Sequence, residues 1–131
     1  IIFYYSPNEK EFVKTVHKKL NNNINVFSNI KTDSIRELAT LLSNCDMFFG
    51  NEGGPRHIAQ SLDIPSFAIF SPSASKKEWL SNACERHQGV EPQDMPLYSH
   101  SLSREEKYAL ITPEYIIAKI EEIYNNFVKR G

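Results

Sequence analysis

The chain has 131 residues, a length typical of one domain with a single hydrophobic core. Hydrophobic residues make up 40% and charged residues 24%, which is typical of globular proteins and unlike disordered chains. The formal net charge of −1 excludes a strong overall attraction to nucleic acid or an acidic membrane, and no apolar run approaches the ~20 residues that span a bilayer.

The first part of the chain predicts two strand–helix pairs. Residues 1–7 are rich in β-branched and aromatic side chains and end at Ser-Pro, as a buried strand does. Apolar residues at helical spacing predict a helix over 8–20, and residues 24–30 predict a second strand. Ser34 and Glu37 form a capping-box pattern that opens the next helix.

Two further strands are predicted at residues 47–50 and 66–70, with a helix over 55–62 between them. The order β-α-β-α-β-α-β predicts an α/β fold with a parallel sheet of about four strands, covered by helices on both faces. Residues 71–111 show a weaker pattern, and we expect a short helix near 76–82 followed by an irregular surface segment. A last amphipathic helix begins at Thr112 and runs to about Lys129.

The cysteines and the first residues of the chain indicate the cellular compartment of the protein and whether the sequence is a fragment. Cys45 lies in an apolar helical pattern and is expected in the core, while Cys84 has no partner at metal-ligand spacing. Two cysteines are too few for a disulfide framework, which favours a reducing compartment. Because Ile1 begins within a predicted strand, without Met or a leader, we expect the chain to be a fragment of a longer protein.

The most unusual segment is GNEGGPRH, residues 50–57, which follows the third predicted strand. In a parallel α/β sheet, ligands bind at the carboxyl ends of the strands. Gly53 and Gly54 let a ligand approach the backbone, and the following helix start offers unpaired N–H groups to an anion. Arg56 and His57 add side-chain donors. From spacing alone, a plain glycine turn between strand and helix is an equal alternative, since neither a dinucleotide fingerprint nor a P-loop is present.

The segment GNEGGPRHIAQSLDIPSFAIFSPS resembles the donor-binding segment of glycosyltransferase family 9, the heptosyltransferases of lipopolysaccharide core assembly. In that family the pattern is an acid, a hydroxyl residue, Gly, two variable residues and His. Here Glu52 falls at the acid, which is usually Asp, and Gly53 falls at the hydroxyl residue. The resemblance covers roughly residues 1–80 and includes the helix around 32–42.

The resemblance implies roles for the residues at this turn. His57 would bind a donor phosphate and stabilise the departing nucleotide diphosphate, and it is the predicted catalytic residue. Glu52 would face sugar or ribose hydroxyls, since a carboxylate repels phosphate. A capping role is the alternative for Glu52, and a polar turn is the favoured alternative for Ser71. The predicted donor-binding residues are Asn51, Glu52, Gly53, Gly54, Arg56, His57 and Ser71.

The resemblance also implies a Rossmann-like domain, the C-terminal half of a GT-B enzyme, with its first β-α unit missing. Residues 1–131 would form one donor-binding domain that is inactive alone. The acceptor, a glycolipid or glycan, would bind through an N-terminal domain that this chain lacks. No cofactor and no metal are expected, and the donor would be a nucleotide-diphosphate sugar such as ADP-heptose.

The expected reaction is an inverting glycosyl transfer, in the cytoplasm at the inner face of the bacterial inner membrane, with at most peripheral membrane contact and no nucleic-acid partner. Two alternatives remain open. One is a stand-alone, non-catalytic nucleotide- or phosphate-binding module. The other is a different GT-B enzyme, such as a nucleotide-sugar epimerase.

Overall fold

A computed structural model describes residues 1–80 and 85–129 of the chain. By its contacts the chain divides into two compact units, residues 1–37 and 38–131, which are described separately. The expectation of a single domain stays a prediction. Among the described residues, no helix combines the length and the apolarity needed to cross a membrane.

The first unit contains one main helix. A 3₁₀ turn, Pro7–Glu9, leads into α1 (Lys10–Lys19), which buries Val13. The helix ends at Lys19, and Asn21 and Asn22 just after it have positive φ (53° and 49°). Asparagine tolerates this left-handed backbone, so these residues let the chain turn away from the helix.

The two strands predicted in the first unit are wrong as regular strands. The two segments are joined by an isolated parallel bridge between Ile2 and Phe27, with Phe3 N–H donating to the carbonyl of Phe27 at 2.8 Å and Phe27 N–H donating to the carbonyl of Ile1 at 2.8 Å. Ile24 and Phe27 stay exposed, with 87% and 50% of their surface accessible. Parallel strands are stabilised by burial of both faces, so a pair with such exposed side chains does not extend into a ladder.

The second unit is built on a parallel sheet of three strands in the order β1-β2-β3: β1 (Phe48–Asn51), β2 (Ser66–Ile69) and β3 (His87–Val90). The pairs Phe48–Ser66 and Ser66–His87 set its register. The strands predicted at 47–50 and 66–70 are confirmed. β3 lies in the segment expected to be irregular, because His-Gln-Gly carries little of the apolar pattern that marks a buried strand.

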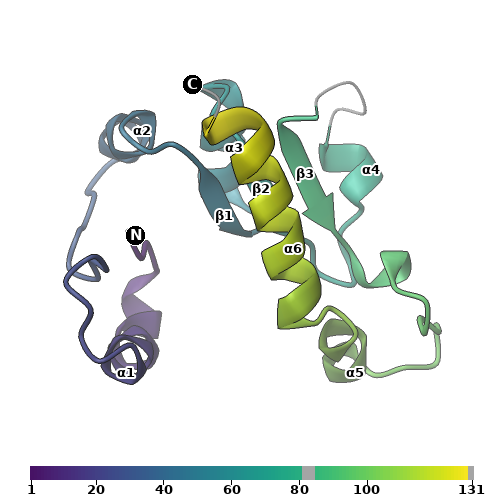
Figure 1. Ribbon diagram of the computed structural model, residues 1–131. Coiled ribbons are helices and arrows are strands. Elements are labelled where there is room, and N and C mark those ends of the chain that lie inside the picture. The colour runs from purple at the N-terminus through teal and green to yellow at the C-terminus, as the bar shows by residue number, and fades with distance from the viewer. Residues whose placement is uncertain (81–84, 130–131) are drawn as a thin grey trace. The chain divides into compact units, whose positions relative to one another are not determined.

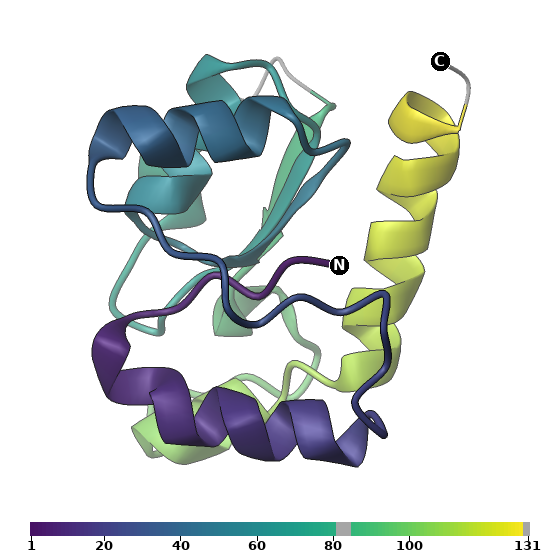
Figure 2. The same cartoon turned by 90° about the vertical axis from the view of Figure 1, so that its left-hand side faces the viewer.

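Helices cover both faces of this sheet, which confirms the α/β Rossmann-like fold class. On one face, α2 (Ile35–Ser43) and α3 (Gly54–Ser61) bury Leu38, Leu42 and Ala59. On the other face, α6 (Pro113–Ile123) crosses the strands (Figure 1). Figure 2 shows the sheet between α2 and α6.

The start signals of two helices act as the sequence predicts. At α2, the Ser34 hydroxyl accepts the N–H of Glu37 at 3.2 Å, whereas the Glu37 carboxylate reaches Asp33 N–H. At α6, Thr112 accepts the N–H of Tyr115 at 3.3 Å. Each cap satisfies a backbone donor that the first helical turn leaves free.

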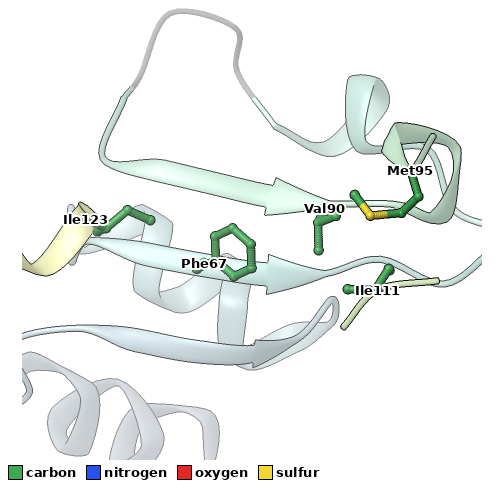
Figure 3. Close-up of a cluster of buried hydrophobic side chains, with 5 residues drawn as sticks. All are labelled: Phe67, Val90, Met95, Ile111 and Ile123. Atoms are coloured by element: carbon green, nitrogen blue, oxygen red, sulfur yellow. The ribbon is translucent and has the colours of Figure 1, made fainter. Parts of the chain in front are cut away.

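The core between α6 and the sheet consists of five buried side chains (Figure 3). Phe67 and Val90 come from β2 and β3, and Ile123 from the end of α6. Met95 and Ile111 come from the connections that precede α6. This cluster packs α6 against the sheet and so holds the strands of the sheet in place.

Several short elements complete the second unit. α4 (Lys76–Trp79) follows β2, which confirms a helix near residue 76; its predicted end at Asn82 lies outside the described residues. α5 (Arg104–Ala109) is a helix that the sequence did not predict. A 3₁₀ turn at Pro92–Asp94 follows β3, and a π-helical turn at Tyr124–Val128 continues α6 toward Lys129 as predicted.

Candidate functional site

The candidate site lies where β1 ends and α3 begins. Asn51 is the last residue of β1, and α3 starts three residues later at Gly54. The backbone N–H of Glu52 donates to the carbonyl of Ile69 at 2.9 Å, so the turn is tied to the end of β2. The turn therefore leaves the sheet at its carboxyl edge, where α/β folds bind ligands.

Gly53 has a backbone conformation that explains its residue type. Its φ is 150° and its ψ −169°, a region that only glycine adopts readily. A Cβ on Gly53 would meet no atom within 4 Å, so the restriction comes from the backbone and not from space. A serine or threonine at this position would strain this turn.

Arg56 is fully buried, with none of its surface accessible. Its Nη1 donates to the Gln60 side-chain oxygen at 2.5 Å, and its Nη2 lies 2.8 Å from Nδ1 of His57. The guanidinium carbon lies 5.9 Å from the centroid of the Phe70 ring, at cation–π distance. The Arg56 side chain therefore does not face solvent. Within the described chain its Nε has no hydrogen-bond partner.

Three ionisable side chains at this turn, Glu52, Arg56 and His57, influence one another electrostatically. Burial lowers the pKa of the Arg56 guanidinium, and the charge of Glu52 partly opposes this shift. Desolvation lowers the pKa of His57, the neighbouring Arg56 charge lowers it further, and Glu52 opposes both. The arrangement therefore favours a neutral imidazole beside a permanent cation.

His57 is exposed on the first turn of α3, and its ring meets Trp79 of α4. The ring centroids are 5.2 Å apart and the planes cross at 72°, an edge-to-face contact. Trp79 is half-exposed, at 50%. The position of Trp79 in the sequence, shortly after the SPS turn that ends β2, was a signal that it could lie near this site.

The predicted residues Asn51 and Ser71 occupy the ends of two neighbouring strands. Asn51 is exposed, and Ser71 follows β2 by two residues. The Ser71 hydroxyl lies 2.8 Å from the hydroxyl of Ser73 and accepts the Ser73 N–H at 3.1 Å. Ser71 is thus engaged in its own turn, which fits the polar-turn alternative.

The edge of the sheet also carries an acidic pair that the sequence reasoning missed. Glu91 follows β3 and accepts the backbone N–H of Lys76 at 2.8 Å. The Lys76 ammonium contacts both oxygens of Asp94, at 2.8 Å and 2.6 Å. Lys76 thus links α4 to the turn after β3. The sequence does not reveal this contact, because β3 itself carries little strand pattern.

The structure thus brings Glu52, Arg56 and His57 together at one turn, with Gly53 and Gly54 beside them, and adds Trp79. Asn51 and Ser71 lie at the same edge of the sheet, at the ends of β1 and β2. In residues 1–80 and 85–129, no cluster of three or more His, Cys, Asp or Glu residues is placed to hold a metal ion. Cys45, expected in the core, is partly exposed and its thiol donates to Leu41 O at 3.4 Å.

Comparison with known proteins gives one match. The family model described as "Glycosyltransferase family 9 (heptosyltransferase)" matches residues 1–108, which include both compact units in large part and the whole candidate site. No curated protein and no solved structure matches the chain.

Proposed function

Since the chain belongs to glycosyltransferase family 9, we propose that it binds the nucleotide-sugar donor of a glycosyl transfer reaction at the start of α3. Family membership supports a glycosyltransferase function of the heptosyltransferase kind. The donor, the acceptor and the stereochemistry belong to the proposal.

The observation that carries the proposal is the turn formed by Gly53 and Gly54 at the carboxyl end of β1. The first turn of a helix has backbone N–H groups without intrahelical partners, and the helix dipole adds partial positive charge there. A Cβ would find open space at both glycines, so a ligand meets backbone and not side chains. A diphosphate is the group that suits such a site.

Glu52 is assigned to hydroxyl groups of the donor. Its carboxylate acts electrostatically on both Arg56 and His57, so it lies close to the proposed phosphate position. A carboxylate in contact with a diphosphate would repel it, whereas sugar and ribose hydroxyls donate hydrogen bonds to carboxylates. Glu52 therefore orients the sugar or the ribose.

In the proposed reaction an acceptor hydroxyl attacks the anomeric carbon of the donor. The new carbon–oxygen bond forms while the bond to the nucleotide diphosphate breaks, and the configuration inverts. The acceptor proton passes to a base outside this chain. The developing charge on the departing diphosphate is stabilised by the N–H groups of α3 and by a hydrogen bond from His57.

The test uses the full-length native protein and four probes, ADP, GDP, UDP and CDP. In wild type, at least one of these nucleotides at millimolar concentration should shift the backbone amide NMR signals of residues 52–57. His57→Ala should weaken its affinity roughly tenfold, the loss expected for one hydrogen bond to a charged group. His100→Ala, at an exposed histidine of the second unit, is the matched control and should bind like wild type.

No amide shift with any of the four nucleotides would contradict the diphosphate site. Equal affinity in wild type and His57→Ala would remove His57 from it. Binding without sugar transfer from a panel of nucleotide sugars would favour the non-catalytic module instead, and conversion of the donor sugar without an acceptor would favour the epimerase.

A further inference from the structure

We propose that Trp79 is a donor-binding residue, on whose indole the base of the nucleotide stacks. This assignment rests on the proposed function for the position of the diphosphate at the start of α3. It adds a residue for the base, a part of the donor that the glycine turn, Glu52 and His57 do not recognise.

The indole lies beside the helix start that is proposed to bind the diphosphate. His57 belongs to the first turn of α3, and its ring centroid is 5.2 Å from that of Trp79. Trp79 reaches His57 from α4, which follows β2, whereas the turn at Gly53 and Gly54 follows β1. Two paired strands are thus followed by backbone N–H groups on one side and by an aromatic ring on the other. A nucleotide held by its diphosphate at α3 would have its remaining parts close to this ring.

Much of the indole is free to receive a ligand. Half of the surface of Trp79 is accessible, although a tryptophan has a large apolar area to bury. Its contact with His57 is edge-to-face, with ring planes that cross at 72°. In such a pair one ring presents its edge to the face of the other, so His57 covers at most one face of the indole. Exposed aromatic surface therefore remains next to the site.

The backbone around Trp79 is fixed by hydrogen bonds on both sides of the residue. Glu78 N–H donates to the carbonyl of Ser75 at 3.2 Å, and Leu80 N–H donates to the carbonyl of Lys76 at 2.9 Å. The ring itself is in contact with His57. A rigid aromatic side chain that is already in position loses little conformational freedom when a ligand stacks on it.

A nucleobase is the part of the donor that suits this surface. Bases have flat aromatic faces, and they stack on protein aromatic rings whatever their hydrogen-bonding pattern. The sugar and the ribose instead carry hydroxyl groups, which need hydrogen-bond partners such as the Glu52 carboxylate. The indole and the carboxylate thus match different parts of one ligand, the base at Trp79 and the hydroxyl groups at Glu52.

The experiment compares ligands with and without a base on the full-length protein. Calorimetric titration measures the affinities of ADP, GDP, UDP, CDP and inorganic pyrophosphate for wild type, Trp79→Ala and Trp79→Phe. In Trp79→Ala, the nucleotide that wild type binds most tightly should lose about 5- to 150-fold in affinity, the effect of removing one stacked base. The affinity for pyrophosphate, which has no base, should equal that of wild type.

Two further variants and one spectrum sharpen this comparison. Trp79→Phe keeps a smaller aromatic ring and should lose less affinity than Trp79→Ala. Tyr124→Ala removes another half-exposed aromatic ring, 48% accessible and just after α6, and as the matched control it should bind both kinds of ligand like wild type. The indole N–H signal of Trp79 in the NMR spectrum, identified by its absence in Trp79→Phe, should shift more with the nucleotide than with pyrophosphate.

Three outcomes would overturn the assignment. Nucleotide and pyrophosphate affinities that fall by the same factor in Trp79→Ala would mean that the indole acts only through His57. An unchanged nucleotide affinity in both folded Trp79 variants would mean that the base binds elsewhere. A loss of affinity for a nucleotide sugar, but not for the nucleotide alone, would place the sugar on the indole.

The two proposals fail separately in these measurements. If pyrophosphate shifts the amide signals of residues 52–57 but nucleotide affinity does not depend on Trp79, the diphosphate site is supported and the stacking is overturned. If nucleotide affinity depends on Trp79 but pyrophosphate shifts none of these amides, the diphosphate site is contradicted and the stacking is still supported.

Discussion

At the start of α3, neighbouring glycines have different reasons to be glycine. Gly53 has a backbone angle, φ 150°, that other residues rarely adopt, whereas no positive φ is recorded for Gly54. Both have open space where a Cβ would be. The pair therefore separates the effect of backbone conformation from the effect of crowding.

Gly53→Ala should lower the free energy of unfolding by about 1–3 kcal/mol, the usual size of a backbone strain of this kind. Gly54→Ala should change it by no more than about 0.5 kcal/mol, as exposed substitutions without strain do. Urea unfolding of the two variants beside wild type measures the difference. Equal stability of the two variants would show that the turn at Gly53 relaxes without cost.

Sequence reasoning located this turn but not its contacts. The run of glycines between an apolar strand and a helix indicated a close backbone approach, and Gly53 and Gly54 are where it predicted. The burial of Arg56 was not predictable, because arginines are usually exposed and this one depends on Gln60 and Phe70 coming together around it. The contact between Trp79 and His57 was not predictable either, because it joins two elements that are separated in sequence.

Among the elements, α6 shows how the buried face of an amphipathic helix contributes to stability. Ile123 at its end is fully buried against the sheet, while Ile117 in its middle is 54% exposed. The helical period of isoleucines predicted the helix, because a face that recurs every three to four residues is buried in an α/β fold. β3 shows the opposite case, because its residues have no such period and the strand is defined by pairing with β2.

Ile123→Ala should destabilise the protein by about 2–5 kcal/mol, since it leaves a cavity beside Phe67 and Val90. Ile117→Ala makes the same chemical change on the same helix and should cost about 0.5 kcal/mol or less. Thermal or urea unfolding of the pair tests this. A large loss in Ile117→Ala would mean that the exposed side of α6 is covered in the native protein.

At the scale of the whole molecule, His87 links stability to pH. It is buried at the start of β3, with Nδ1 3.0 Å from the Ser66 hydroxyl and Nε2 3.5 Å from Asp63. Burial lowers the pKa of His87 below the ordinary 6.5, Asp63 opposes the shift, and the charges of Arg86 and Arg56 add to it. The folded protein therefore resists a proton that the unfolded chain accepts.

Stability should consequently be complete above pH 6.5 and decrease as the pH falls below it, by at most about 1.4 kcal/mol per pH unit from this group. Urea unfolding between pH 7.5 and 5.5 measures the slope. His87→Gln should reduce the slope, leaving the smaller part due to His57, whose pKa is also lowered. The carboxylates with lowered pKa, Glu9, Glu11 and Glu106, lose their contribution only below pH 4.5, outside this range.

His100→Gln, an exposed histidine, is the control and should keep the wild-type slope. If His87→Gln and wild type lose stability equally over this range, the buried imidazole is not the group that responds to pH.

The ion pair between Lys76 and Asp94 connects the turn after β3 to the candidate site through α4. Lys76 and Trp79 stand at opposite ends of the four-residue helix α4, so whatever holds one end sets the place of the other. Glu91 and Asp94 hold the Lys76 end, through its backbone N–H and its ammonium. Through α4, the acidic turn after β3 therefore helps to position the indole that contacts His57.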